Sequence, residues 1–385
     1  MAGAAALSLT ACIGGLSGPP TPSANVGTPQ APPSGSTIGN GATRIALILP
    51  LTGSGGAAAA ASMRNAAELA LQEFQNPDLT ILVKDDRGTA DGARLAAEEA
   101  IAEGAELILG PLFAQSVQAA GAVARQANRP VIAFSTDATV ASRGVYLMGF
   151  LPQPEVDRVI DYAAQQGRRS VAAAIPETVY GNVVEAQFRE TAARRGMRVA
   201  AIERYPNGQP QAAITRLSTI IGGASPQADA VFLPETPDQA PALGQALAGI
   251  GFNPQRVKPL GTGVWNDPRV LRVAQLQGGW FAAPDQAGYQ GFAQRYRAKF
   301  GADPVRIATL SYDAVSLAAA LTRTQGSQRF SEGVLTNPSG FAGADGVFRF
   351  NANGTNDRGL AVMEVRNGSS VAVSAAPRAL GGSGT

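Results

Sequence analysis

Apolar and polar positions alternate in a regular rhythm from residue 44 onward. Short apolar runs, typical of buried strands, are separated by longer stretches in which apolar residues recur as on one face of a helix. The strand-like runs cover residues 45–49, 79–84, 106–109 and 130–134, and the helical stretches cover residues 57–75, 90–103 and 115–127. Because strands that alternate with helices form a parallel sheet with helices on both faces, this pattern predicts an α/β fold.

A second series of the same kind follows the segment YLMGFLPQPEVDR. It predicts strands at residues 170–175, 198–204, 229–233, 257–261 and 278–284, and helices at residues 153–166, 181–195, 210–221, 237–249, 286–300 and 305–322. The connection near residues 149–152 is short, so two α/β units of similar size follow each other directly. We expect the chain to return afterwards to the first unit, which makes both units discontinuous in sequence.

Composition narrows the range of functions. The chain has 385 residues, 45% apolar and 16% charged, with a net charge of +2, and it shows no basic stripe that would favour nucleic acid. It contains no histidine, the residue that most often serves as a general base or a zinc ligand. It contains one cysteine, so no disulfide can form within the chain. We find no paired carboxylates, nucleophile elbow or Ser-x-x-Lys motif. We therefore expect a protein that is not an enzyme and that needs neither a cofactor nor a metal.

The first residues resemble the end of an export signal. Residues 1–12 (MAGAAALSLTAC) are small and apolar, and their last four letters resemble a bacterial lipobox, in which Cys12 becomes the lipidated N-terminus. Residues 13–43 lack charge and are rich in Pro, Gly, Ser and Thr, which predicts a flexible spacer. In the lipoprotein sorting pattern, a residue other than Asp after the cysteine, here Ile13, favours the outer membrane. We therefore expect a periplasmic body that Cys12 anchors to a membrane, preferably the outer one.

The first glycine-rich loop leaves the kind of ligand open. The segment IALILPLTGSGGA (residues 45–57) combines the end of a strand, a loop and the start of a helix, as in many phosphate sites. Gly53, Gly55 and Ala58 fit the G-x-G-x-x-G/A spacing of a dinucleotide site. In such a site the first glycine follows almost directly on the strand, whereas here three residues intervene. The loop could equally offer its backbone to another ligand.

Two aspartates at the end of the second strand have the same two interpretations. An acid at the position of Asp85 or Asp86 would bind ribose hydroxyls in a dinucleotide fold. Both residues also directly precede a turn and a helix that Thr89 or Asp91 could cap. We therefore favour turn and capping roles for these aspartates over dinucleotide binding.

Four stretches, taken together, resemble one protein family. They are ALILPLTGSGG, DDRGTADGARLAAEEAI, GAELILGPLFAQSVQAAGAVARQANRPVIAFSTDAT and FAGADGVFRFNANGTNDRGLAVMEV, in matching order over about residues 44 to 370. On these motifs the chain resembles the type I periplasmic solute-binding proteins, in the branch that binds Leu, Ile and Val. The resemblance implies two Rossmann-like lobes that are joined by three crossings and clamp a ligand between them. That architecture agrees with the two α/β units predicted above.

The resemblance also implies a division of the chain. Lobe 1 would comprise residues 44–150 plus 281–335, and lobe 2 would comprise residues 151–280 plus 336–372. A disordered tail would follow at residues 373–385.

The carboxyl ends of the strands in both lobes would face the ligand cleft. The ligand-binding candidates at these ends are Thr52, Gly53, Ser54, Gln115, Ser116, Ser135, Thr136, Asp137, Tyr180, Glu235 and Trp265. Tyr180 stands where the family often has an aromatic wall. Some of these candidates could instead have structural roles. Ser135 and Asp137 could cap helices or turns, Tyr180 could pack in the core, and Glu235 could face solvent.

Several positions depart from the amino-acid binders of this branch. Those proteins hold the ligand carboxylate with a serine in the Gly-Pro loop and with a Ser/Thr run after the fourth strand. Here the first position holds Ala114 or Gln115, and the second run contains Asp137, which would repel a carboxylate. The acid that pairs the ligand amine is absent from LGTGVWND. The resemblance therefore supports the fold more strongly than it supports an amino-acid ligand.

A second group of relatives is also similar. Penicillin-binding protein activators of the outer membrane carry a C-terminal domain of this fold, and LPLTG, GPLF, IPETVYGN and ADAVFLPETPDQ resemble that group. Two functions follow as expectations. The first is a non-enzymatic lipoprotein that binds a small polar, amino-acid-like ligand and delivers it to the permease of an ABC-type importer. The alternative is a lipoprotein that regulates peptidoglycan synthesis by binding a penicillin-binding protein.

Overall fold

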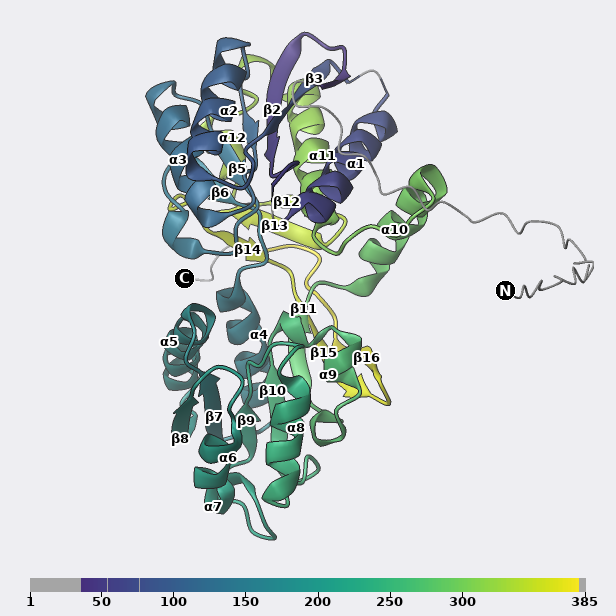
Figure 1. Ribbon diagram of the computed structural model, residues 1–385. Coiled ribbons are helices and arrows are strands. Elements are labelled where there is room, and N and C mark those ends of the chain that lie inside the picture. The colour runs from purple at the N-terminus through teal and green to yellow at the C-terminus, as the bar shows by residue number, and fades with distance from the viewer. Residues whose placement is uncertain (1–35, 54, 76, 381–385) are drawn as a thin grey trace, which may run out of the picture. The chain divides into compact units, whose positions relative to one another are not determined.

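Two mainly parallel sheets, each covered by helices on both faces, carry the fold (Figure 1). The computed structural model describes residues 36–53, 55–75 and 77–380. All of them lie within one unit of the chain, Ala31–Thr385. The alternation of strands and helices confirms the predicted α/β class, and Cys12 and the rest of residues 1–35 lie outside the described part.

The sheet of lobe 1 has the strand order β1-β3-β2-β4-β5-β6, and only β1 runs antiparallel to its neighbour. In the central strand β2 every residue except Arg44 is buried, as expected for a parallel strand that is covered on both faces. Helices α2 and α3 cover one face, and α1 and α11 lie side by side on the other (Figure 1). The elements are β1 (Thr37–Gly39), β2 (Thr43–Leu49), α1 (Ala57–Glu73), β3 (Leu79–Asp85), α2 (Ala90–Ala102), β4 (Ile108–Leu109), α3 (Ala114–Gln126), β5 (Val131–Ala133), β6 (Val145–Leu147), α10 (Gln286–Phe300), α11 (Ala308–Thr324) and α12 (Glu332–Leu335).

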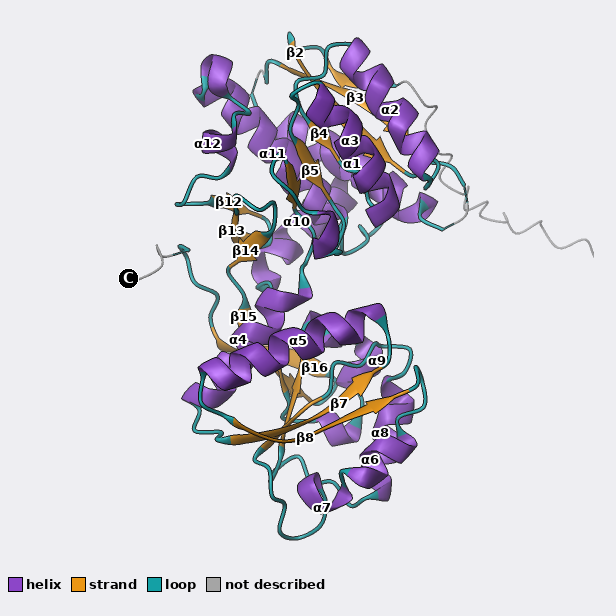
Figure 2. Ribbon diagram, turned by 90° about the vertical axis from the view of Figure 1, so that its left-hand side faces the viewer, coloured by secondary structure: helices purple, strands orange, loops and turns teal. Residues whose placement is uncertain are grey.

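The sheet of lobe 2 has the order β16-β15-β11-β10-β9-β7-β8, with β15 and β16 antiparallel to their neighbours. Helices α4 and α5 lie side by side over one face (Figure 2), and α6, α8 and α9 pack on the other. The elements are α4 (Pro152–Gln165), β7 (Ser170–Pro176), α5 (Val179–Arg194), β8 (Arg198–Tyr205), α6 (Gln211–Arg216), α7 (Ser218–Ile221), β9 (Ala230–Phe232), α8 (Ala240–Gly249), β10 (Lys258–Gly261), α9 (Pro268–Leu271), β11 (Trp280–Ala283), β15 (Ala361–Arg366) and β16 (Ser369–Ser374).

The chain crosses between the lobes three times, from β6 to α4, from β11 to α10 and from the third sheet to β15. The third sheet is small and antiparallel, and consists of β12 (Phe341–Gly343), β13 (Gly346–Phe350) and β14 (Asn356–Arg358). The side-chain amide of Asn356 donates hydrogen bonds to the carbonyls of Leu147 (2.7 Å) and Gly149 (2.9 Å). The third crossing is therefore tied directly to the first.

The structure differs from the sequence expectations at the edges of the lobes. Thr37–Gly39, inside the expected spacer at residues 13–43, forms β1 because the open edge of β3 supplies its hydrogen-bonding partner. The segment 336–372, expected wholly in lobe 2, is divided, since Phe348 and Phe350 of β13 pack in the core of lobe 1. At the C-terminal end, β16 continues into the expected tail because it pairs with β15 as far as Ser374.

Trp265 is a central packing residue of lobe 2. Its side chain is 0% exposed, its indole N–H donates to the carbonyl of Leu233 (3.0 Å), and its ring packs beside Phe281. A Cβ atom added to Gly261 would lie 2.2 Å from the Trp265 ring, so the glycine is needed for this close approach. The indole thus fills the space between β10, β11 and the loop after β9.

We predict that Trp265→Phe lowers the free energy of unfolding by about 2–4 kcal/mol, because it leaves a cavity and removes the buried hydrogen bond to the carbonyl of Leu233. Chemical denaturation measures this change directly. Leu95→Ala is the matched control, since Leu95 is 49% exposed on α2 and its loss should change stability by less than about 0.5 kcal/mol. Equal effects of the two substitutions would show that Trp265 does not pack as described.

Candidate functional site

A cavity of about 570 Å³ lies where residues of both lobes meet at the carboxyl ends of their strands. Its walls follow β5, β6, β7, β10 and β11, which is where open parallel sheets bind ligands. The lining residues are Thr136, Asp137, Ala138, Thr139, Phe150, Pro152, Gln153, Glu155, Val179, Tyr180, Val183, Gly263, Val264, Asn266, Ala283, Pro284 and Arg306. About half of these residues have apolar side chains, three carry a carboxyl or guanidinium group, and Tyr180 adds a phenol.

Glu155 is the buried acid of this cavity. It lies in the first turn of α4, where the helix dipole favours a negative charge, and is only 7% exposed. Its Oε2 accepts a hydrogen bond from the backbone N–H of Gly263 (2.9 Å). Burial raises the pKa of Glu155 to about 8, although the Gly263 N–H and the charge of Arg306 oppose this shift. In the cavity without ligand this carboxyl is therefore largely neutral at neutral pH.

Gly263 makes this arrangement possible. A Cβ atom at this position would lie 2.6 Å from Oε1 of Glu155, closer than any real contact. A glycine after β10 thus allows the carboxyl to approach the backbone of the opposite loop.

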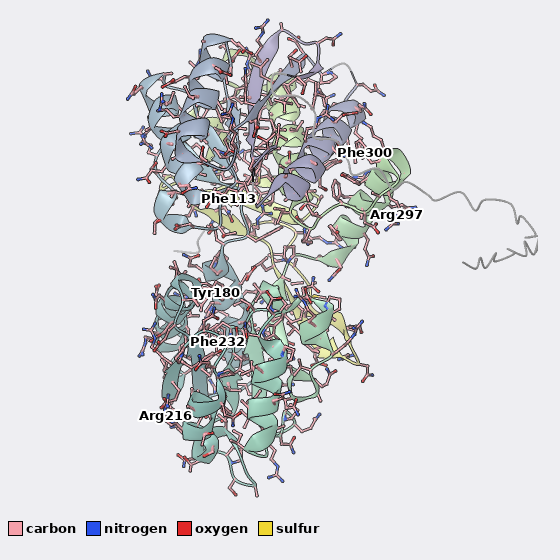
Figure 3. All side chains as sticks on the ribbon, viewed as in Figure 1. Phe113, Tyr180, Arg216, Phe232, Arg297 and Phe300 are labelled. Carbon is pink, nitrogen blue, oxygen red and sulfur yellow. The ribbon has the colours of Figure 1, made fainter. Side chains whose placement is uncertain are left out.

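Tyr180 supplies an aromatic wall from the first turn of α5. The hydroxyl of Thr178 caps this helix by accepting from the N–H of Gly181 (2.9 Å), which fixes the turn that carries Tyr180. The Tyr180 hydroxyl shares a hydrogen bond with Oγ1 of Thr262 (2.6 Å), and burial raises its pKa well above the usual range. The phenol therefore stays neutral. In Figure 3 it lies at the end of lobe 2 where α5 begins, while Phe232 lies within the sheet.

Arg306 brings a positive charge that is already paired. Its guanidinium binds both carboxylate oxygens of Asp345, at 2.6 and 3.1 Å, and lies 4.8 Å from the ring centroid of Phe150. Asp345 is fully buried behind it. The cavity therefore receives an arginine whose charge is largely neutralised.

Of the sequence candidates, Thr136, Asp137 and Tyr180 line this cavity. Asp137 caps a short helical turn, since its Oδ1 accepts from the N–H (2.9 Å) and the hydroxyl (2.7 Å) of Thr139. The expected capping role of Asp137 is thus present together with its place on the wall.

None of the described residues of the first glycine-rich loop lines this cavity. Oδ1 of Asp85 accepts from the backbone N–H groups of Leu51 (2.9 Å) and Thr52 (3.2 Å), and the Thr52 hydroxyl also bonds this carboxylate. Gly53 is exposed with a φ of 98°, and Ser54 lies outside the described residues. Asp85 therefore organises the loop, as the turn interpretation predicted, and leaves fewer N–H groups for a phosphate.

Asp86 and the cap of helix α2 also have the turn and capping roles that the sequence predicted. Asp86 accepts from the N–H of Gly88 (2.9 Å), and the hydroxyl of Thr89 caps α2 by accepting from the N–H of Gly92 (3.0 Å). The predicted turn and capping chemistry is confirmed at these positions.

Three further candidates are bonded within lobe 1 instead of facing the cavity. The Gln115 amide donates to the carbonyl of Gly88 (3.0 Å), and the buried Ser116 hydroxyl donates to that of Thr89 (3.2 Å). Ser135 is also buried, and its hydroxyl accepts from the N–H of Asp137 (3.1 Å). These hydroxyl and amide groups hold the loops together.

The positions expected for Glu235 and Trp265 are corrected by the structure. Glu235 is buried and accepts from the Tyr205 hydroxyl (2.6 Å) and from the N–H of Thr236 (2.8 Å), so it is neither solvated nor on the cavity wall. Trp265 points into the core of lobe 2, because its indole N–H finds its partner there.

Sequence reasoning missed Glu155, Phe150 and Arg306. An acid three residues after the start of a proline-initiated helix, in the segment that joins the lobes, was the available signal for Glu155. Phe150 lies in the short connection between the two predicted units, near residues 149–152, but no sequence motif marked it as a ligand-binding candidate. We see no sequence signal for Arg306, because its place depends on the return of the chain after β11.

The described residues offer neither a metal cluster nor a membrane span. No group of three or more Asp, Glu, Cys or His among them could hold a metal ion. None of the described helices combines the length and apolarity that crossing a bilayer requires.

Known proteins that resemble this chain belong to a family of binding proteins. Residues 42–370 match the family described as periplasmic binding protein. No curated protein matches the chain.

Solved structures share the fold. A protein from Rhodospirillum rubrum, designated a branched-chain amino acid ABC transporter, has a TM-score of 0.77 with 22% identity over 86% of this chain and 99% of its own. A substrate binding protein from Streptococcus pneumoniae, in complex with isoleucine, has a TM-score of 0.62 with 20% identity, covering 87% and 99% of the two chains. A solute binding protein from Rhodopseudomonas palustris, in complex with 3,4-dihydroxybenzoic acid, has a TM-score of 0.62 with 20% identity, covering 87% and 98%.

The family match covers most of the chain, and the two-lobed structure with its cavity agrees with it. The chain belongs to the periplasmic binding protein family.

Proposed function

We propose that this chain is a non-enzymatic extracytoplasmic binding protein that holds a small ligand in the cavity between its lobes and delivers it to an ABC-type importer. The observation that carries this proposal is the cavity of about 570 Å³, whose walls come from the strand ends of both sheets. A ligand there would touch both lobes at once. The volume lies within the range of small-molecule sites, roughly 300–1,000 Å³.

The walls favour a ligand with a sizeable apolar part. Phe150, Val183 and Val264 line the cavity beside the ring of Tyr180. Burying a branched aliphatic or aromatic group against such walls contributes roughly 25 cal/mol per Å² of apolar surface. Structural neighbours were solved with isoleucine, leucine, benzoate and 3,4-dihydroxybenzoic acid. These compounds are therefore the first candidates, and an amino-acid-like ligand is among them.

A second function has one observation in its favour. Gln115, Ser116 and Ser135, which the resemblance assigns to a ligand, are bonded within the protein. A protein of this fold that binds a penicillin-binding protein through its surface would not need them free. We keep this regulator of peptidoglycan synthesis as the alternative.

Anchoring is a separate proposal. Cys12 and its lipobox lie outside the described residues, so the lipid anchor rests on the sequence pattern alone. A lipid at Cys12 would hold the binding body near a membrane, which suits both functions.

The binding function predicts that a cognate ligand raises the melting temperature by mass action. Leucine, isoleucine, benzoate and 3,4-dihydroxybenzoate at millimolar concentration form the first panel for a thermal shift assay. Tyr180→Ala should weaken binding of the responding compound by about tenfold or more, because it removes an aromatic wall. Tyr180→Phe, which keeps the ring, is the matched control. A panel extended to other small solutes that never shifts the melting temperature would contradict the binding function.

The alternative function predicts capture of a bifunctional penicillin-binding protein from detergent-solubilised membranes. Capture should persist in the Tyr180→Ala variant, because the surface and not the cavity would make the contact. Loss of capture in a cavity variant, or failure to capture the purified synthase at all, would count against this alternative.

The anchoring proposal predicts that Cys12→Ser in the full precursor releases the protein from the membrane fraction into the soluble periplasmic fraction. Ser17→Ala, a nearby change in the expected spacer, is the control and should remain in the membrane fraction. A Cys12→Ser protein that stays with the membrane would show that the lipobox interpretation is wrong.

A further inference from the structure

We propose that the ligand carries a protonated amine on an apolar body and that Glu155 binds this amine. The inference rests on the proposed function, because it concerns the same cavity. It assigns the recognised group to a residue at the start of α4, outside the set that the sequence predicted.

The charges around the cavity favour a cation. Asp137, Glu155 and Arg306 carry its carboxyl and guanidinium groups, and the phenol of Tyr180 stays neutral. Arg306 donates to both carboxylate oxygens of the buried Asp345, so that pair is close to neutral. The remaining two groups are both acids. An ammonium group could therefore pair with an acid, whereas a free carboxylate would face Asp137 and, once it ionises, Glu155.

Glu155 has the capacity to accept further hydrogen bonds. A carboxylate offers about four acceptor positions. Among the described residues, the N–H of Gly263 is the only donor within hydrogen-bonding distance of this carboxyl. A buried carboxylate with a single neutral donor is poorly compensated, and an ammonium group would compensate both its charge and its acceptors.

Three of the side chains that the family resemblance assigns to the ligand are already bonded within the protein. Gln115, Ser116 and Ser135 are bonded to the backbone of lobe 1, and none of them lines the cavity. This distribution favours a ligand whose affinity comes from its amine and its apolar body.

Aromatic rings do not offer the cation an equally good alternative. Phe150 has the guanidinium groups of Arg306 and Arg358 at 4.8 and 5.0 Å from its ring centroid, so its ring already interacts with two arginines of the protein. The ring of Tyr180 is therefore the aromatic surface for the ligand body, while Glu155 is the anchor for the ammonium.

Binding of an amine should be coupled to proton release. Burial raises the pKa of Glu155 to about 8, with Arg306, Arg358 and Tyr180 near it and Asp137 on the same cavity wall. An ammonium group favours the carboxylate form, so binding expels the proton that Glu155 carries below this pKa. Affinity for an amine should therefore rise from about pH 6 to about pH 8 and then level off. A ligand that accepts a hydrogen bond from the neutral acid would show the opposite trend.

Isothermal titration calorimetry with matched probes tests the proposal. The aromatic series is 2-phenylethylamine, L-phenylalanine and 3-phenylpropionate, and the aliphatic series is 3-methylbutylamine, L-leucine and 4-methylpentanoate. In at least one series we expect the amine to bind about tenfold more tightly than the carboxylate, with the amino acid between them. Glu155→Gln keeps an acceptor for Gly263 and removes the charge, so it should weaken the amine about tenfold and abolish the pH trend. Asp137→Asn removes the other carboxylate of the cavity wall and should weaken amine binding less than Glu155→Gln does.

The outcomes separate the two proposals. Equal or tighter binding of the carboxylate probes, or unchanged amine affinity in Glu155→Gln, would overturn the role of Glu155 while leaving the binding function intact. If Asp137→Asn weakens amine binding more than Glu155→Gln does, the amine binds Asp137, and the proposed role of Glu155 is overturned as well. If no probe of any charge binds and the thermal shift panel is also negative, the binding function fails and this inference fails with it.

Discussion

The burial of parallel strands on both faces is the constraint on which the rest of the structure depends. In β2 and β7 almost every side chain is inside a core, so the strand interiors leave little room for polar chemistry. Polar residues are placed where the strands end, and parallel strands end on the same edge of a sheet. Much of the cavity lining follows from this rule, since it comes from the loops and helix starts that follow β5, β6, β7, β10 and β11, whereas Arg306 enters after α10.

The junction between the lobes is held by buried charges. Arg358 lies at the end of β14, is buried, and donates to the carbonyl of Met148 (2.6 Å) in the first crossing. Burial and the charge of Asp345 raise the pKa of Asp313 to about 7. Buried charges are costly unless they are paired in a defined geometry, and such geometry also fixes the segments that carry them. Phe150 belongs to this junction and to the cavity wall, so a ligand would contact the point where the crossings meet.

Much of the fold could be predicted from the sequence because long apolar runs report burial directly. The strand predicted at residues 79–84 is β3, and the helix predicted at residues 286–300 coincides with α10. β1 was missed because its three residues lack any periodic pattern and depend on β3 for pairing. The segment after β11 was hard to divide because membership in a lobe is decided by tertiary packing, as Phe348 shows.

The site was less predictable because the sequence shows which residues follow a strand and not where their side chains point. Trp265 and Glu235 both follow strands of lobe 2, yet both point into the protein, where Leu233 and Tyr205 bind them. Tyr180 faces the cavity because the Thr178 cap sets the first turn of α5. The orientations of Trp265 and Glu235 depend on hydrogen bonds between residues distant in sequence, and that of Tyr180 depends on a local cap, and the periodicity of apolar residues records neither.

Glu155 illustrates how such a fold can change its ligand without changing its framework. Its position is set by the start of α4 and by the absence of a side chain at Gly263, two local features that leave both sheets untouched. A larger residue at position 263 would displace the carboxyl, whereas the hydroxyls of the neighbouring loops would keep their internal bonds. The loops after the strands can thus be stabilised by their own polar groups while one acid from the crossing segment takes over recognition. Specificity in this arrangement depends on a single buried charge and its close contact with the opposite backbone.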